Sequence, residues 1–154
     1  FRKNIVRLQD YGWLFKLQAF APQMADGAAL AQAFPNIPFV LLHAGMPEDR
    51  SPESRRLWRE GMQRLADRPN VHTKFSGLGT FIRRNDPQHI AEIVGETLEL
   101  FGAERCMWGS NFPIEKLWTD YRSIVEAIKA AIASLDAKAQ RAILHDNAAR
   151  LYRL

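Results

Sequence analysis

The sequence predicts an α/β fold in which parallel strands are joined by helical crossovers. Short apolar segments alternate with longer amphipathic ones along the chain, turn residues follow the apolar segments, and no linker or low-complexity tract interrupts this order. With 154 residues, 47% of them hydrophobic and 25% charged, the chain has the balance of one globular domain. The single cysteine, Cys106, excludes a disulfide scaffold and a multi-cysteine metal site.

The first elements are a helix end, a strand and a second helix. Ile5 and Leu8 share one face of a helix over residues 2–11. Residues 13–20, WLFKLQAF, have the aromatic and aliphatic composition of a strand. Apolar residues at helical spacing then predict a helix over residues 23–34.

The middle of the chain repeats this pattern twice. Residues 38–43 are a nearly continuous apolar run, as expected of a strand buried on both faces, and a helix over 53–67 follows. Val71 to Phe75 is the next short strand. The clearest amphipathic helix begins after Asp86 and is capped by Gly102.

The last elements are a short strand over residues 106–108, a helix over 120–133 and a short helix capped by Asp136. Asn147 is the expected cap of the final turn. Parallel strands in this order fit two architectures, an open doubly wound sheet and a (β/α)8 barrel. The chain has no G-x-G-x-x-G or P-loop motif, which disfavours a nucleotide-binding sheet.

Charge and hydropathy exclude several classes of partner. The net charge is +4, but the Arg-rich segment 50–68 is interleaved with Asp and Glu, which predicts a solvated helix face rather than a nucleic-acid stripe. No apolar run approaches the ~18 residues that a membrane span needs. We therefore expect a small-molecule substrate, no nucleic-acid or membrane partner, and a cytoplasmic protein.

In both architectures the functional site lies at the carboxyl ends of the strands. Polar residues close all four predicted strands there, and they are Lys16, Gln18, His43, Lys74, Ser76, Ser110 and Asn111. His43 is the sharpest candidate, because Ala44 and Gly45 are expected to leave space beside its ring. A neutral imidazole at this position either binds a metal, moves a proton, or is a core histidine bonded to a backbone carbonyl.

The positions of the other candidates also allow a functional and a structural interpretation. Lys74 and Ser76 are two residues apart and share one face of the strand, so that the ammonium group either binds an anion in a cavity or reaches solvent. The Asn111 amide takes no proton at useful pH, so it either bonds a substrate oxygen or forms a turn. Three histidines and the cysteine have structural or surface contexts, and these are His72, His89, His145 and Cys106.

Five motifs in order resemble the amidohydrolase-related family of TIM-barrel metal-dependent hydrolases, which includes sugar-acid and pyrone-dicarboxylate lactonases. They are FKLQ at 15–18, FVLLHAGMP at 39–47, VHTKFSGL at 71–78, RCMWGSNFP at 105–113 and HDNAARLYRL at 145–154. The resemblance implies the C-terminal portion of a (β/α)8 barrel spanning residues 1–154. The family's His-x-His strand is not in this sequence, and such barrels have ~250 residues. One further strand is expected within residues 78–104.

The resemblance also implies roles for the candidates. His43 becomes a metal or substrate ligand, Gln18, Lys74 and Ser76 line the substrate pocket, and Asn111 takes the place of the acid that activates water beside a divalent metal, with zinc as the first expectation. Because Asn111 replaces that acid, Glu115 and Asp120 are considered as substitutes. The cofactor expectation is therefore a divalent metal or none.

These implications lead to one main functional hypothesis and one alternative. We expect a hydrolase acting on a small anionic or lactone-like substrate. The alternative is a non-hydrolytic relative, such as a decarboxylase, an isomerase or a binding protein. Because the chain starts at Phe1 and a partial barrel leaves two sheet edges unpaired, we expect a fragment that is inactive alone and prone to self-association, with a homo-oligomer as one form.

Overall fold

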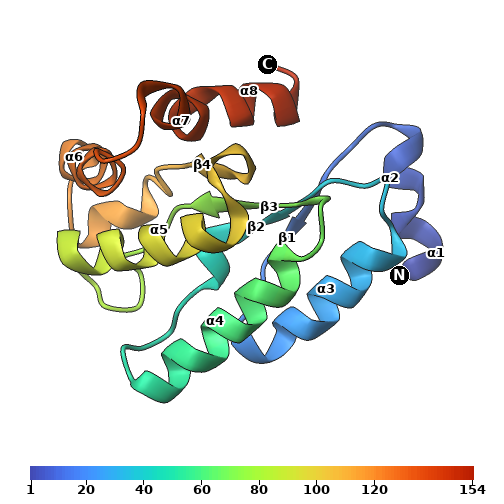
Figure 1. Ribbon diagram of the computed structural model, residues 1–154, viewed down its shortest axis with the longest axis horizontal. Coiled ribbons are helices and arrows are strands. Elements are labelled where there is room, and N and C mark those ends of the chain that lie inside the picture. Colours follow the sequence, from blue (N-terminus) through green and yellow to red (C-terminus); the bar gives the residue numbers. More distant parts are fainter.

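The chain forms one parallel sheet whose strands follow each other in sequence order (Figure 1). The structure is a computed structural model that describes the backbone of residues 1–154 and every side chain except that of Arg2. Its four strands are β1 (Phe15–Leu17), β2 (Phe39–Leu41), β3 (Val71–Phe75) and β4 (Cys106–Trp108). Each pairs in parallel with the next. This steady progression is that of a barrel wall, because a doubly wound sheet would reverse its strand order at a switch point.

Helices connect the strands and cover the sheet. Figure 1 shows α3, α4 and α5 on one side of the strands and α7 and α8 on the other. The longer helices begin and end within two residues of the predicted boundaries. All helical elements are α1 (Arg2–Ile5), α2 (Arg7–Asp10), η1 (Ala21–Gln23), α3 (Met24–Ala33), η2 (Leu42–Gly45), α4 (Pro52–Ala66), α5 (Pro87–Phe101), η3 (Ala103–Arg105), η4 (Ile114–Leu117), α6 (Tyr121–Ala131), α7 (Ala137–Arg141), η5 (Ala142–Asp146) and α8 (Asn147–Tyr152).

The register of the sheet sorts its side chains into two faces. Leu17, Leu41, Thr73 and Cys106 are aligned across the four strands, and all four are buried. Because side chains alternate along a strand, the intervening residues lie on the opposite face. There Lys16, Val40 and His72 are aligned, as are Lys74 and Met107. The second face therefore carries basic and imidazole groups as well as apolar ones.

The Arg-rich helix α4 confirms the prediction of a surface with charges of mixed sign. Arg56 pairs with Glu53 and Glu60 within the helix. Arg55 and Arg59 form ion pairs with Glu96 and Glu99 of α5. None of the helices in the described part of the chain is both long and apolar enough to cross a membrane.

Two predictions about local structure are wrong. Residues 78–83 form turns and α5 occupies most of the remaining stretch, so the segment 78–104 contributes no strand to the described part of the chain. Asn147 does not cap a helix, because the π-helix η5 runs directly into α8 and leaves no helix start there. The Asn147 side chain is instead buried, and its Nδ2 donates to the carbonyl oxygens of Ala103 and Cys106 at 2.7 Å each.

Replacing Asn147 by Ala should therefore destabilise the start of β4. The two carbonyl groups lose this donor in the interior, which we expect to lower the free energy of unfolding by about 1–3 kcal/mol. Urea denaturation of the variant measures this loss. The exposed amide of Gln32 on α3 provides the control, and Gln32→Ala should change stability by less than about 0.5 kcal/mol. Equal stability of the two variants would contradict this role of Asn147.

His72 should make the stability of the protein depend on pH. Burial lowers the pKa of His72 to about 4, and the charges of Arg105 and Arg150 act in the same direction. In the unfolded chain a histidine has a pKa of about 6.5. Between these values the unfolded state binds more protons, so the free energy of unfolding should rise with pH from about 4 to about 6.5. Thermal denaturation across this range should show a shallower rise for His72→Gln, and an unchanged rise would refute the assignment.

Candidate active site

The chain turns sharply at the carboxyl end of β2, and His43 lies in this turn. His43, Ala44 and Met46 have φ angles of 57°, 47° and 51°, and Gly45 between them has 71°. For residues with a side chain the left-handed region costs roughly 1–2 kcal/mol each. Such strain persists only when neighbouring contacts hold it, and it concentrates at functional sites.

The contacts that hold the turn come from inside the protein. The indole Nε1 of Trp58, a residue that is 1% exposed, donates to the carbonyl oxygen of Ala44 at 2.8 Å. Gly45 was expected to open space beside the His43 ring, and this expectation is wrong. A Cβ atom on Gly45 would overlap Met24 Cε and lie 2.9 Å from Met62 Sδ, so glycine is required because the core is filled there.

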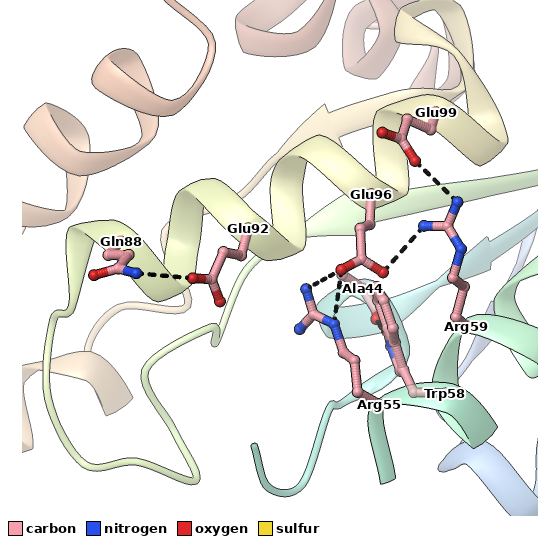
Figure 2. Close-up of polar contacts among 8 residues, drawn as sticks. All are labelled: Ala44, Arg55, Trp58, Arg59, Gln88, Glu92, Glu96 and Glu99. Atoms are coloured by element: carbon pink, nitrogen blue, oxygen red, sulfur yellow. Dashed lines mark hydrogen bonds and ion pairs between the residues drawn. The ribbon is translucent and has the colours of Figure 1, made fainter. Parts of the chain in front are cut away.

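Trp58 is in turn held by a charged contact between α4 and α5. The Arg55 guanidinium lies over the Trp58 ring at 4.8 Å from its centroid. Its Nε and Nη2 donate to Glu96 Oε1 at 2.9 and 2.6 Å, and Arg59 donates to Glu96 and Glu99 at 3.1 and 2.9 Å. Figure 2 shows this row of ion pairs along α5, with Trp58 lying against Ala44 beside it. The strained turn is thus tied to the packing of two helices.

The structure brings His43 together with residues that follow β3 and β4. His43 Nδ1 lies 2.8 Å from Ser76 Oγ, and Ser76 is 4% exposed. A Cβ atom on Gly77 would lie 2.8 Å from His43 Nδ1, 3.1 Å from Asn111 Nδ2 and 3.2 Å from Thr80 Oγ1. Polar groups from three strand ends therefore converge on the backbone of Gly77, whose φ is 61°.

A cavity of about 230 Å³ lies beside this cluster. Three of the residues predicted to form the site line it, namely Gln18, His43 and Asn111. Ser76 contacts the His43 ring, and Lys74 lies outside the lining, close to Gly109. The remaining lining residues are Met46, Gly77, Thr80, Phe81 and Ile114. The carboxyl ends of all four strands thus contribute to one region, as parallel strands require.

Burial governs the protonation of the two basic candidates. Burial lowers the pKa of His43, and the charge of Lys74 lowers it further. The hydrogen bond with Ser76 and the charge of Glu115 partly offset this shift. The imidazole is therefore neutral at pH 7. Burial also lowers the pKa of Lys74, and the Lys16 ammonium adds to this effect. Lys16 itself lies over the Tyr152 ring of α8, 5.9 Å from its centroid.

The two residues considered as substitute acids have different positions. Asp120 accepts hydrogen bonds from the backbone N–H and the hydroxyl of Ser123, which makes it the N-cap of α6. The suggestion that it replaces the site acid is wrong, because those bonds use its carboxylate at an exposed helix start. Glu115 is 4% exposed and accepts a hydrogen bond from Asn111 Nδ2 at 3.1 Å. It therefore contacts a residue that lines the cavity without lining the cavity itself.

The described residues do not by themselves fit a zinc site. His43 Nδ1 faces Ser76, which leaves Nε2 as the nitrogen able to bind a further group. Structural and catalytic zinc sites use three or four protein ligands. Among the side chains that the structure describes, no three His, Cys, Asp or Glu residues come close enough to hold a metal ion. Of the residues that line the cavity, His43 could supply one ligand.

The cysteine and the other three histidines lie outside the lining of the cavity. Cys106 is buried, and burial raises the pKa of its thiol, which disfavours a reactive thiolate. His89 is buried in α5, and His145 is exposed beside Asp146. His72 lies two residues before Lys74 on the same face of β3. Sequence reasoning missed Trp58 as a support of the site, because no local pattern indicates which carbonyl group its indole reaches.

Comparison with known proteins adds three findings. The family model described as amidohydrolase (Amidohydro_2) matches residues 1–154. The chain is 36% identical over 153 residues to the uncharacterized protein y4mH of Sinorhizobium fredii, covering 99% of this chain and 51% of that protein. It is 30% identical over 165 residues to an L-fucono-1,5-lactonase of Burkholderia multivorans, covering 100% of this chain and 56% of the lactonase. The chain thus spans about half the length of these relatives.

A solved structure supports the same relationship. An amidohydrolase from Burkholderia multivorans with bound zinc superimposes on the whole chain with a TM-score of 0.93 at 28% identity. The chain covers 57% of that protein. Together with the sequential order of the parallel strands, this match confirms the predicted part of a (β/α)8 barrel.

Replacing Trp58 by Phe should weaken the turn that carries His43. The substitution keeps an aromatic ring in the core but removes the donor to the Ala44 carbonyl, and we expect a loss of about 1–3 kcal/mol in the free energy of unfolding. Urea denaturation measures it. Trp13→Phe is the matched control, because Trp13 is 61% exposed, and it should cost less than about 0.5 kcal/mol. A Trp58→Phe protein as stable as this control would contradict the role of the indole.

Proposed function

Since this chain belongs to the amidohydrolase family, we propose that it provides half of the active site of a hydrolase acting on a small lactone-like substrate. The observation that carries the proposal is the cavity lined by Gln18, His43 and Asn111 at the carboxyl ends of the strands. Support comes from the L-fucono-1,5-lactonases among the relatives, one of which matches the whole chain. A sugar-acid lactone of this kind is therefore the substrate class to test first.

The chemistry of the cavity suits a polar ring ester. Two amides and one neutral imidazole can exchange hydrogen bonds with the hydroxyl groups and the carbonyl oxygen of a lactone. The ammonium groups of Lys16 and Lys74 lie near one another on the same face of the sheet, and they would favour a substrate or product that carries a carboxylate. Hydrolysis of a lactone creates such a carboxylate.

The residues can be assigned parts of the reaction. Water adds to the carbonyl carbon, the bond from that carbon to the ring oxygen breaks, and the ring oxygen takes up a proton to become a hydroxyl group. Neutral His43, held through Ser76, presents Nε2 to the carbonyl oxygen. Asn111 cannot remove a proton from the water, so its part is to orient water or substrate. Gln18 binds substrate hydroxyls.

One observation favours a second function. The only carboxyl group beside Asn111 among the described side chains, that of Glu115, is already bonded to Asn111, Thr80 and Trp118. A site without a free general base suits a reaction that needs no activated water, such as decarboxylation or isomerisation. Assays that follow loss of carbon dioxide or isomerisation of the same class of acid would distinguish this alternative from lactone hydrolysis.

Replacing His43 should abolish turnover if the proposal holds. In the intact protein, His43→Ala should lower kcat/KM for L-fucono-1,5-lactone by a factor of about 100 or more, the range typical of positioned acid–base groups. Acid release in a pH-stat, corrected for spontaneous hydrolysis, measures the rate. Exposed His145 offers the control, and His145→Ala should retain full activity. Unchanged turnover in His43→Ala would refute the assignment.

The pH dependence should follow the protonation of His43. Because burial lowers its pKa, the imidazole of His43 stays neutral to a lower pH than that of an exposed histidine. The rate should therefore stay level through neutral pH and fall only on the acidic side.

A further inference from the structure

Glu115 is a buried carboxyl group that the proposed reaction does not use. It lies in η4, is 4% exposed, and no ion pair in the described part of the chain reaches it. Its Oε2 accepts from Trp118 Nε1 at 2.7 Å, and its Oε1 accepts from Asn111 Nδ2 at 3.1 Å and from Thr80 Oγ1 at 3.3 Å. Burying a carboxyl group without a cation is costly. The hydrogen bonds from Trp118, Asn111 and Thr80 must offset this cost.

The bond to Asn111 fixes which end of the amide faces the cavity. A carboxylate only accepts hydrogen bonds, whereas an amide has a donating nitrogen and an accepting oxygen. The nitrogen of Asn111 must therefore point to Glu115. Because Asn111 also lines the cavity, its Oδ1 is the acceptor that the side chain can offer to a bound molecule, while one N–H of Nδ2 is held by Glu115.

The surroundings leave this arrangement little freedom. Asn111 has a φ of 54°, a conformation that asparagine tolerates better than most residues, and its carbonyl oxygen accepts from the backbone N–H of Glu115 at 3.4 Å. A Cβ atom on Gly79 would lie 2.6 Å from the Arg84 carbonyl oxygen and 3.2 Å from Glu115 Oε2. The 77–80 loop thus packs closely against the carboxyl group.

We propose that Glu115 is a positioning residue that orients the Asn111 amide, so that Oδ1 serves as a fixed hydrogen-bond acceptor in the cavity. The partner of this acceptor is a water molecule or a hydroxyl group of the substrate. The orientation itself rests on the hydrogen bonds of this chain, and only its use in lactone binding rests on the proposed function.

The hydrogen bond between Asn111 and Glu115 should couple the effects of substitutions at these two positions. Asp at position 111 would place two carboxylates at hydrogen-bond distance, where they repel one another. Gln at position 115 together with Asp at position 111 would restore the hydrogen bond with donor and acceptor exchanged. In that exchanged pair an acceptor oxygen still faces the cavity. The two positions should therefore be coupled.

The test compares four forms of the intact protein: the parent, Asn111→Asp, Glu115→Gln and the double variant. Thermal denaturation should show a large fall in Tm for Asn111→Asp and a recovery of most of that fall in the double variant. A Glu126→Gln variant at an exposed position of α6 should leave Tm unchanged. Where Asn111→Asp does not fold, folding of the double variant supports the pair and its failure to fold overturns it.

A second readout reports on the amide directly. The side-chain NH₂ signals of Asn111 in ¹⁵N NMR spectra should be resolved and slow to exchange in the parent, and should broaden or exchange faster in Glu115→Gln. In lactone assays Glu115→Gln should raise KM several-fold, with partial restoration in the double variant. Additive Tm changes with unaltered amide signals would overturn the positioning role. Coupling and protected signals without lactone turnover would instead overturn the proposed function alone.

Discussion

The left-handed turn after β2 is the constraint on which the candidate site depends. Three residues with side chains occupy a backbone region that costs each of them roughly 1–2 kcal/mol. The turn persists because Trp58 donates to the Ala44 carbonyl group and because two methionines fill the space beside Gly45. Trp58 is held through Arg55 by Glu96 (Figure 2), so the position of His43 depends on the packing of α4 against α5.

The order of the sheet explains why polar groups from distant parts of the chain meet. Four consecutive parallel strands place all their carboxyl ends on one edge, and the residues that follow them come from positions 18, 43, 76 and 111. A shared glycine, Gly77, lets His43 and Asn111 approach the same backbone. Burial then keeps the imidazole neutral and lowers the pKa of Lys74, so the environment as well as the residue types shapes the chemistry.

The sequence predicted most elements and much of the site because strong periodicity and strand-end position are local signals. β3 and β4 have the predicted ends, and Gln18, His43 and Asn111 meet at one cavity. Prediction from the sequence failed where contacts between distant parts of the chain determine the role of a residue. Asn147 resembles a cap, but its acceptors lie more than 40 positions earlier in the chain. Gly45, Asp120 and Trp58 were misjudged or missed because packing and long-range hydrogen bonds define their roles.

The proposed function requires that this cavity bind a lactone-like ligand between His43 and Asn111. A crystal structure of the intact protein with a non-hydrolysable lactone analogue tests it most directly. We expect the analogue in the cavity beside Gln18, with its carbonyl oxygen within hydrogen-bond distance of His43 Nε2 and a hydroxyl group donating to Asn111 Oδ1. An analogue bound elsewhere, or an Asn111 amide turned so that its oxygen faces Glu115, would refute this arrangement.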